Sequence, residues 1–229
     1  GSRGLGDVYK RQIHAVSAAP YGSVSMLPVT YGYLLMLGAE GLKHVTEMAI
    51  LNANYLASSF EKLGFKILFK GKQGRVGHEM IWDCSAFNKE YGISELDIAK
   101  RLMDFGFHAP TLSFPVHGTL MVEPTESEPK EELDRFIEAL KTIREEMCEV
   151  AEGKADKTDN VLKNAPHTHK VLTADEWTHT YPRSKAAYPL PWVAENKFWP
   201  QVGRVDDGYG DRNLMCTCDP LYDYVNDEN

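Results

Sequence analysis

The stretch GFKILFKGKQGRVGHEMIWDC, residues 64–84, holds two short apolar runs on either side of a turn. Residues 65–69 form the first run, and residues 76–84 form the second. In the second run one face would hold Val76, His78, Met80, Trp82 and Cys84, and the other Gly77, Glu79, Ile81 and Asp83. Such alternation is typical of a strand with one buried face. Gly71-Lys72-Gln73-Gly74 supplies the residues of a turn between the runs. The stretch therefore predicts a β-hairpin.

Helical patterns flank this hairpin on both sides. Before it, a helix is expected to begin at Gly41 and to end at Gly64, because apolar residues recur at steps of three and four. Its buried face would be Val45, Met48, Ala49, Asn52, Tyr55, Leu56, Phe60 and Leu63. After the hairpin, Ser94 is expected to cap a helix over residues 95–105.

A third strand and a long acidic helix complete this region. Residues 119–123 are expected to form the strand, and residues 125–129 carry the start signals of the helix. Its apolar stripe would be Leu133, Phe136, Ile137, Leu140, Ile143, Met147 and Val150. The order helix, strand, strand, helix, strand, helix predicts an α/β layer of antiparallel or mixed strands with helices covering one side.

The N-terminal part differs from this pattern. Residues 1–12 have neither an initiator Met nor the apolar run of a signal peptide, and we expect them to be a cloning or sequencing remnant. Residues 18–28 predict a turn of small residues that runs into a helix, with Ser25 as its cap and Pro28 in its first turn.

The helical periodicity is lost after Gly153. Residues 165–220 hold six of the 12 prolines and three of the 4 tryptophans of the chain. Such a segment is extended yet apolar, so it needs a surface on which to lie. We therefore expect residues 154–229 to form an extended C-terminal arm that wraps around the α/β layer.

Composition excludes several classes of protein. The net charge of −8 and the pI of about 5.5 argue against binding to nucleic acid, which needs a basic face. No apolar run approaches the roughly 18 to 20 residues that span a bilayer, so no membrane association is expected. The 4 cysteines are too few for a disulfide framework, which favours a reducing compartment.

Several stretches together carry a family resemblance. They are Val16-Ser17-Ala18-Ala19-Pro20-Tyr21-Gly22-Ser23, Ile50-Leu51-Asn52-Ala53-Asn54-Tyr55, residues 106–111, residues 118–127 and residues 197–218. In this order they resemble the C-terminal end of the glycine cleavage system P proteins, over essentially residues 16–220. The resemblance implies the C-terminal small domain of an aminotransferase-like, fold type I, pyridoxal phosphate enzyme. Residues 13–40 would come from the interface at the end of the large domain, residues 41–153 would be the small α/β domain, and residues 154–229 the wrapping arm.

The resemblance also implies an activity. Proteins of this family decarboxylate glycine through pyridoxal phosphate and transfer the aminomethyl group to the lipoyl arm of the H protein, as homodimers or heterotetramers. They are cytoplasmic in bacteria and mitochondrial in eukaryotes. A non-catalytic module that binds a carrier protein or partner subunit remains an alternative, and so does another pyridoxal phosphate enzyme with a similar small domain.

The Schiff-base lysine of the family is missing from this sequence. In the family it lies in a His-Lys stretch that is followed by glycines. Here Lys43-His44 has the wrong order, and His169-Lys170 is followed by Val171 and Leu172 rather than by glycines. We therefore expect the chain alone to form no Schiff base with the cofactor and to be inactive as a fragment.

Some polar residues are candidates for a binding site. The resemblance makes Gly22 and Ser23 candidates for contact with the cofactor phosphate, and the alternative is a tight turn with an N-cap and no ligand. The candidates for a substrate or lipoyl channel are His108, Thr111, Glu123, Thr125, His167, Arg204 and Arg212. Helix capping is the alternative role for Thr125 and Ser127, and ion pairs that fix the arm are the alternative for His167, Arg204, Asp211 and Arg212.

Two further motifs suggest a metal or a redox site. His78-Glu79 lacks the second histidine of a zinc-protease helix, and in a strand the two side chains would point apart, so a hydrogen-bonding role is expected. Cys216 and Cys218 are separated by one residue, which is not a zinc spacing. No metal is expected, but either thiol could pair with another cysteine as a redox latch.

Overall fold

The structure is a computed structural model, and it describes residues 23–214. Its centre is a four-stranded antiparallel sheet in the order β1-β2-β4-β3. The strands are β1 (Lys66–Leu68), β2 (Met80–Asp83), β3 (Thr111–Leu112) and β4 (Thr119–Val122). Ile67 lies opposite Trp82 in the first pair, and Trp82 lies opposite Leu120 in the second. The hairpin, the antiparallel pairing and the strand after residue 118 are confirmed.

The second strand of the hairpin is shorter than the sequence predicts. Residues 76–79 lie outside β2. Val76 makes its backbone hydrogen bonds with the side chain of Asn54 instead: Val76 N donates to Asn54 Oδ1 at 3.1 Å, and Asn54 Nδ2 donates to Val76 O at 2.9 Å. Strand β3 was not predicted, since two residues are too short for a periodicity to register.

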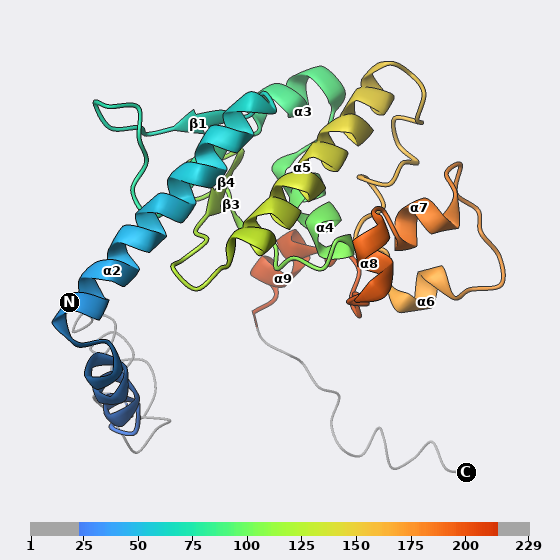
Figure 1. Cartoon of the computed structure of the whole chain (residues 1–229). Helices are drawn as coiled ribbons and strands as arrows, with labels where there is room; N and C mark the ends of the chain where they lie inside the picture. The colour runs from blue at the N-terminus through green and yellow to red at the C-terminus, as the bar shows by residue number, and fades with distance from the viewer. Residues whose placement is uncertain (1–22, 215–229) are drawn as a thin grey trace, which may run out of the picture.

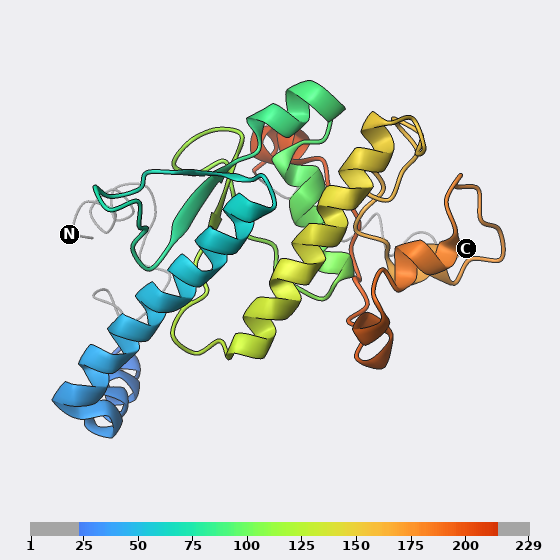
Figure 2. The same ribbon diagram turned by 45° about the horizontal axis from the view of Figure 1, so that its top comes forward.

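Four helices pack with the sheet. They are α2 (Met26–Lys62), α3 (Ser85–Tyr91), α4 (Glu95–Asp104) and α5 (Lys130–Ala151). Figures 1 and 2 show α2 and α5 side by side on one face of the sheet, and α5 also contacts α3 and α4. Trp82 is fully buried between them, stacked on Phe60 at 5.3 Å and edge-on to Phe65 at 4.7 Å between ring centroids.

Helix α4 begins as predicted. The Ser94 side chain accepts a hydrogen bond from Asp97 N, and the Asp97 side chain accepts one from Ser94 N, which makes a capping box. Helix α3 was not predicted, because its seven residues carry only one buried side chain, Phe87.

One predicted helix start is wrong, and the alternative role of Thr125 and Ser127 as helix caps is not realised. Helix α2 does not begin at Gly41 but runs from Met26 through a break at Gly38, whose φ of 61° is a left-handed conformation that suits glycine. Helix α5 begins at Lys130 with Pro129 at its N-cap, so neither Thr125 nor Ser127 caps it. The Thr125 hydroxyl accepts a hydrogen bond from Ser127 N at 3.2 Å instead.

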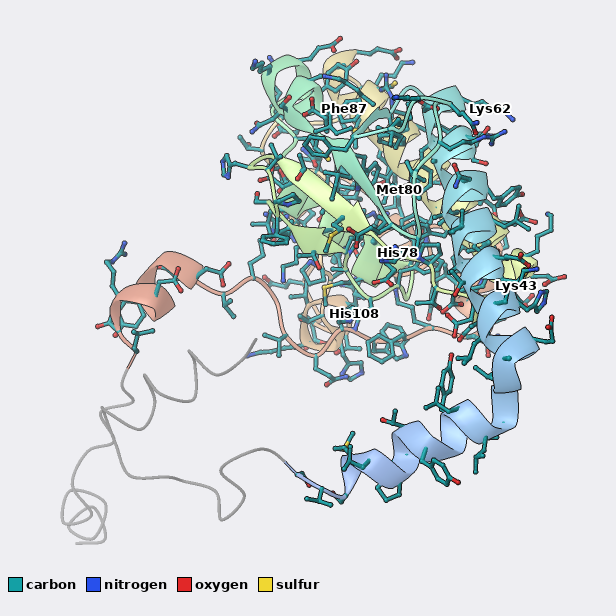
Figure 3. All side chains as sticks on the ribbon, turned by 90° about the vertical axis from the view of Figure 1, so that its left-hand side faces the viewer. Lys43, Lys62, His78, Met80, Phe87 and His108 are labelled. Carbon is teal, nitrogen blue, oxygen red and sulfur yellow. The ribbon has the colours of Figure 1, made fainter. Side chains whose placement is uncertain are left out.

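The first part of α2 projects away from the rest of the chain (Figures 1 and 3). Most of its large apolar side chains are exposed: Leu35 is 66% exposed and Met36 is 87% exposed. The buried residues of the helix start only at Asn52. The predicted buried face is therefore realised in the C-terminal half of α2, where Asn52, Leu56 and Phe60 are buried.

The segment after α5 contains four short helices among its described residues, and thus is not extended throughout. They are α6 (His169–Leu172), α7 (Arg183–Ala187), α8 (Pro191–Glu195) and α9 (Asp207–Arg212). Val161, Leu162 and Val193 join the main core, while Leu172 belongs to a smaller cluster with Trp177 and Trp199 packed against it. None of the helices within residues 23–214 is long and apolar enough to cross a membrane.

Candidate functional site

A cavity of about 360 Å³ lies where the C-terminal half of α2, the loop after α4, the end of β4 and the start of α5 meet. Four of the seven predicted channel residues line it: His108, Thr111, Glu123 and Thr125. The other lining residues are Leu56, Phe107, Ala109, Pro110, Met121, Val122, Pro124, Glu128, Glu132, Leu133 and Phe136. Residues from two separate loops therefore converge on one space.

The loop after α4 orients one side of this cavity. Gly106 ends the helix with a φ of 86°, which turns the chain. Phe107 then packs edge-on against Phe136, with 5.0 Å between their ring centroids, and this leaves the next side chain, His108, exposed at the cavity. Thr111 follows as the first residue of β3, paired with Met121.

Asn52 holds the opposite rim. Its side chain is buried with 6% exposed, and Nδ2 donates to Thr125 O at 2.9 Å and to Glu128 O at 3.3 Å. Thr125 has a φ of 60°, a conformation that costs a non-glycine residue of order 1–3 kcal/mol and needs support from its surroundings. Sequence reasoning placed Asn52 on the buried face without a role, although an amide on an apolar stripe signals a specific partner.

The polar lining is acidic and the floor is apolar. Among the lining residues, Leu56, Leu133 and Phe136 are buried, while Glu123 and Glu128 are exposed. Such a cavity suits a ligand with a hydrocarbon stem and a polar or positively charged end.

His78 approaches the cavity from the loop between β1 and β2. Its Nε2 lies 3.8 Å from an oxygen of Glu123 and 3.9 Å from an oxygen of Glu79. His78 and Glu79 lie outside β2 and contact each other, so the expectation that they point apart is wrong. Within residues 23–214 no group of three or more His, Cys, Asp or Glu side chains could hold a metal ion.

His167 lies outside the cavity, in a buried cluster of charges. Its backbone N donates to Asp104 Oδ1, and its Nδ1 lies 2.7 Å from Asp104 Oδ2, while Nε2 is 2.8 Å from the Tyr181 hydroxyl. Asp104 also pairs with Arg101, which in turn forms a bidentate pair with Glu146. Burial opposes ionisation of Asp104, but the bonds from His167 and the charge of Arg101 outweigh it and lower the pKa of this carboxyl.

The Arg204 side chain also makes hydrogen bonds within the fold. Nη1 donates to Asp97 Oδ1 at 2.7 Å, Nε donates to Ala165 O at 2.8 Å and Nη2 donates to Leu162 O at 2.9 Å. Asp211 and Arg212 are exposed on α9. Neither Arg204 nor Arg212 lines the cavity.

The remaining candidates lie at the ends of the chain. Ser23 is exposed, and its hydroxyl is 2.6 Å from that of Ser25, which does not cap α2 with its side chain. Gly22, Cys216 and Cys218 lie outside the described residues.

Comparison with known proteins gives consistent matches. The family model for the C-terminal domain of glycine dehydrogenase matches residues 45–167. Relatives named glycine dehydrogenase (decarboxylating) include that of Bdellovibrio bacteriovorus, 56% identical over 212 residues, and that of Flavobacterium johnsoniae, 60% identical over 216 residues. A third, from Bordetella avium, is 55% identical over 214 residues.

These matches cover 93–94% of this chain but only 22% of each relative. The chain thus spans about a fifth of the length of the relatives. The resemblance read from the sequence is confirmed at the level of the family. The chain belongs to the family of glycine dehydrogenase C-terminal domains.

Proposed function

We propose that this chain is the C-terminal part of a decarboxylating glycine dehydrogenase that passes an aminomethyl group to the lipoyl arm of a carrier, the H protein. The carboxylate of glycine leaves as carbon dioxide, the aminomethyl group bonds to one sulfur of the lipoyl disulfide, and the other sulfur becomes a thiol. The carbon is oxidised and the disulfide is reduced. The observation that carries the role of this chain is the convergence of His108, Thr111, Glu123 and Thr125 on one cavity.

Pyridoxal phosphate, the cofactor that the resemblance implies, does not fit this cavity by itself. The cofactor needs a lysine amine for its Schiff base and cations or backbone donors for its phosphate. The cavity lining holds three glutamates and one histidine, but no lysine or arginine. We therefore place the cofactor and its lysine in the part of the enzyme that lies beyond this chain, with Gly22 and Ser23 near its phosphate.

In this proposal the cavity belongs to the channel for the lipoyl arm. The apolar floor at Leu56, Leu133 and Phe136 would pack along the hydrocarbon stem of that arm. Glu123, beside His78, would face the amine that the arm carries away. Thr111 and the strained backbone at Thr125 would set the width of the channel.

The exposed part of α2 has a place in the same proposal. Residues 13–40 would belong to the interface with the large domain, and the exposed apolar side chains from Met26 to Met36 would be buried against it or against a second subunit. Residues 41–153 would be the small domain and residues 154–229 the arm. Since the relatives named above are bacterial, we propose a cytoplasmic enzyme.

The test uses the full-length enzyme and this chain alone, each with pyridoxal phosphate. Carboxyl-labelled glycine should yield labelled carbon dioxide with the full-length enzyme and lipoylated H protein, and none with the chain alone. His108→Ala and Glu123→Gln should reduce turnover in the full-length enzyme, whereas Arg212→Ala, outside the cavity, should not. Absence of glycine-dependent carbon dioxide release by the full-length enzyme, or release from a different amino acid, would refute the proposal.

A further inference from the structure

A basic segment interrupts this acidic chain. Residues 62–78 contain five lysines and arginines and no aspartate or glutamate, whereas the whole chain has a net charge of −8. Within the described residues, Lys70 pairs with Glu61 and Lys66 pairs with Asp83, but Lys72 and Arg75 have no carboxylate within 4 Å. Residues 69–79 join β1 to β2, and we call residues 69–78, which precede Glu79, the basic loop.

An aromatic side chain stands at the start of the basic loop. Phe69 is 69% exposed, and its φ of 54° is the left-handed conformation that a bulky residue rarely adopts. The strained backbone costs free energy of folding, and the exposed ring contributes no burial to offset it. Strained residues of this kind cluster at binding sites. Phenylalanine and arginine are also enriched in the cores of protein interfaces.

The basic loop is held in one shape by its own hydrogen bonds. Gly71 N donates to Arg75 O at 2.8 Å, and Gly74 N donates to Gly71 O at 2.9 Å. Asn54 then fixes Val76 to α2 through two further bonds. A loop that is ordered before binding loses little conformational entropy when a partner arrives.

The C-terminal end of the basic loop lies near the cavity, although no residue of the loop is among those that line it. It enters β2 at Met80, which pairs with Val122 of β4, next to Glu123 in the cavity lining. His78, at the end of the loop, lies 3.8 Å from Glu123. Figure 3 shows His78 between Met80 and His108 on the same side of the molecule. A partner bound to the basic loop would therefore stand on the side of the molecule where His78 contacts Glu123 of the cavity lining.

We propose that the basic loop is the docking surface for a partner protein that presents carboxylates around an apolar patch. The inference rests on the proposed function, in which this partner is the lipoyl-bearing carrier. Phe69 enters the apolar patch, while Lys72 and Arg75 pair with the carboxylates. The net charge of −8 disfavours a nucleic acid or an anionic membrane as the occupant, since both carry extended negative charge.

The test uses the full-length enzyme, its K72E/R75E and F69S variants, and a control, K141E/K157E, whose lysines are exposed and lie on α5 and in the segment after it. Two quantities are measured with H protein: the Kd of the fluorescently labelled protein, and its KM as the acceptor. The rate with free lipoamide, which has the disulfide but no protein surface, is measured for comparison. The charge reversal should raise Kd and KM about tenfold, with F69S about threefold. The rate with free lipoamide should not change in either variant. The increase in Kd caused by K72E/R75E should become smaller as salt is added.

Several results would overturn the inference. One is a Kd for H protein that matches wild type in both loop variants; another is an equal increase in the control. A third is that F69S weakens binding to heparin or to phosphatidylserine vesicles but leaves the Kd for H protein unchanged. The proposed function fails separately if the wild-type enzyme binds H protein but releases no carbon dioxide from glycine with either acceptor.

Discussion

Asp104 accepts hydrogen bonds from the backbone N of His167 and contacts the His167 ring at 2.7 Å, across 63 residues of sequence. The first residue ends α4 in the α/β layer, and the second belongs to the segment after α5. Arg101, fully buried, joins the same carboxylate and also donates to the backbone oxygens of Lys185 and Ala186. One buried cluster of charges thus ties two distant stretches of the chain together.

Asp104→Asn should destabilise the protein strongly. The change removes a charge that Arg101 faces in a buried site, and breaking one partner of a buried ion pair costs about 3–5 kcal/mol. Because Glu146 still pairs with Arg101, we expect a loss of about 3 kcal/mol in the free energy of unfolding, measured by urea denaturation. Asp175→Asn, on the exposed surface, serves as the control and should change it by less than about 0.5 kcal/mol. Equal losses in the two variants would contradict the prediction.

The carboxyl of Asp97 should make the free energy of unfolding depend on pH in the acid range. Burial opposes the ionisation of Asp97, but hydrogen bonds from Lys163, Ser94 and Arg204 outweigh it and lower the pKa of the carboxyl. A group with a lowered pKa stabilises the folded state above its unfolded pKa of about 3.9, and this stabilisation is lost as pH falls through the folded pKa.

The variant Arg204→Met isolates this contribution. It removes the bond to Asp97 and also the bonds to Ala165 O and Leu162 O, which do not titrate. The difference in unfolding free energy between wild type and variant should therefore be constant from pH 7 to about 5 and should shrink below about pH 4. Urea denaturation at pH 7 to 2.5 measures it. A difference that stays the same down to pH 2.5 would exclude this role for Asp97.

The sequence predicts local features of this fold better than distant ones. The hairpin at residues 64–84 and the helix cap at Ser94 are encoded by neighbouring residues, and both predictions are confirmed. A separate helix was expected to begin at Gly41, whereas α2 runs from Met26 and breaks at Gly38. Both residues are glycines, and only the backbone conformation distinguishes them. The pairing of Asp104 with His167 could not be inferred, since no local pattern joins residues so far apart.

The candidate site residues also fall into two groups, those that line the cavity and those that do not. His108, Thr111, Glu123 and Thr125 were selected as polar residues in loops at the ends of strands and helices, and such loops converge in a small α/β layer. His167 and Arg204 were selected on residue type alone. Arginine and histidine serve in buried ion pairs as readily as in ligand sites, so burial had to decide between the two.

The amine of Lys197 should make the free energy of unfolding depend on pH in the alkaline range. Its amine donates to Asp104 O at 2.6 Å, and burial lowers the pKa of Lys197 to about 8. Burial of the charged amine opposes folding below pH 8. Between pH 8 and about 10.4 the unfolded chain holds a proton that the folded chain has released, so this penalty is relieved and stability increases as pH rises. In Lys197→Met that contribution is gone. The unfolding free energy of wild type minus that of the variant should rise between pH 7.5 and 10, and a constant difference would show that the amine is not desolvated.

Asn52→Ala should loosen the rim of the cavity. The carbonyls of Thr125 and Glu128 lose their buried donor, which costs about 1–3 kcal/mol, and the left-handed backbone at Thr125 loses the bond that supports it. The control is Asn88→Ala, at an exposed position of α3.

Hydrogen exchange distinguishes a local effect from general destabilisation. In Asn52→Ala the amides of residues 125–128 should exchange at least about tenfold faster than in wild type, while those of β2 change only as far as global stability falls, because the rim opens without unfolding the sheet. In the full-length enzyme the same variant should raise KM for the lipoyl-bearing acceptor more than it lowers kcat, since the donor shapes the channel and touches no reacting atom. If the exchange of residues 125–128 and of β2 accelerates by the same factor, Asn52 stabilises the whole layer and has no particular role at the cavity.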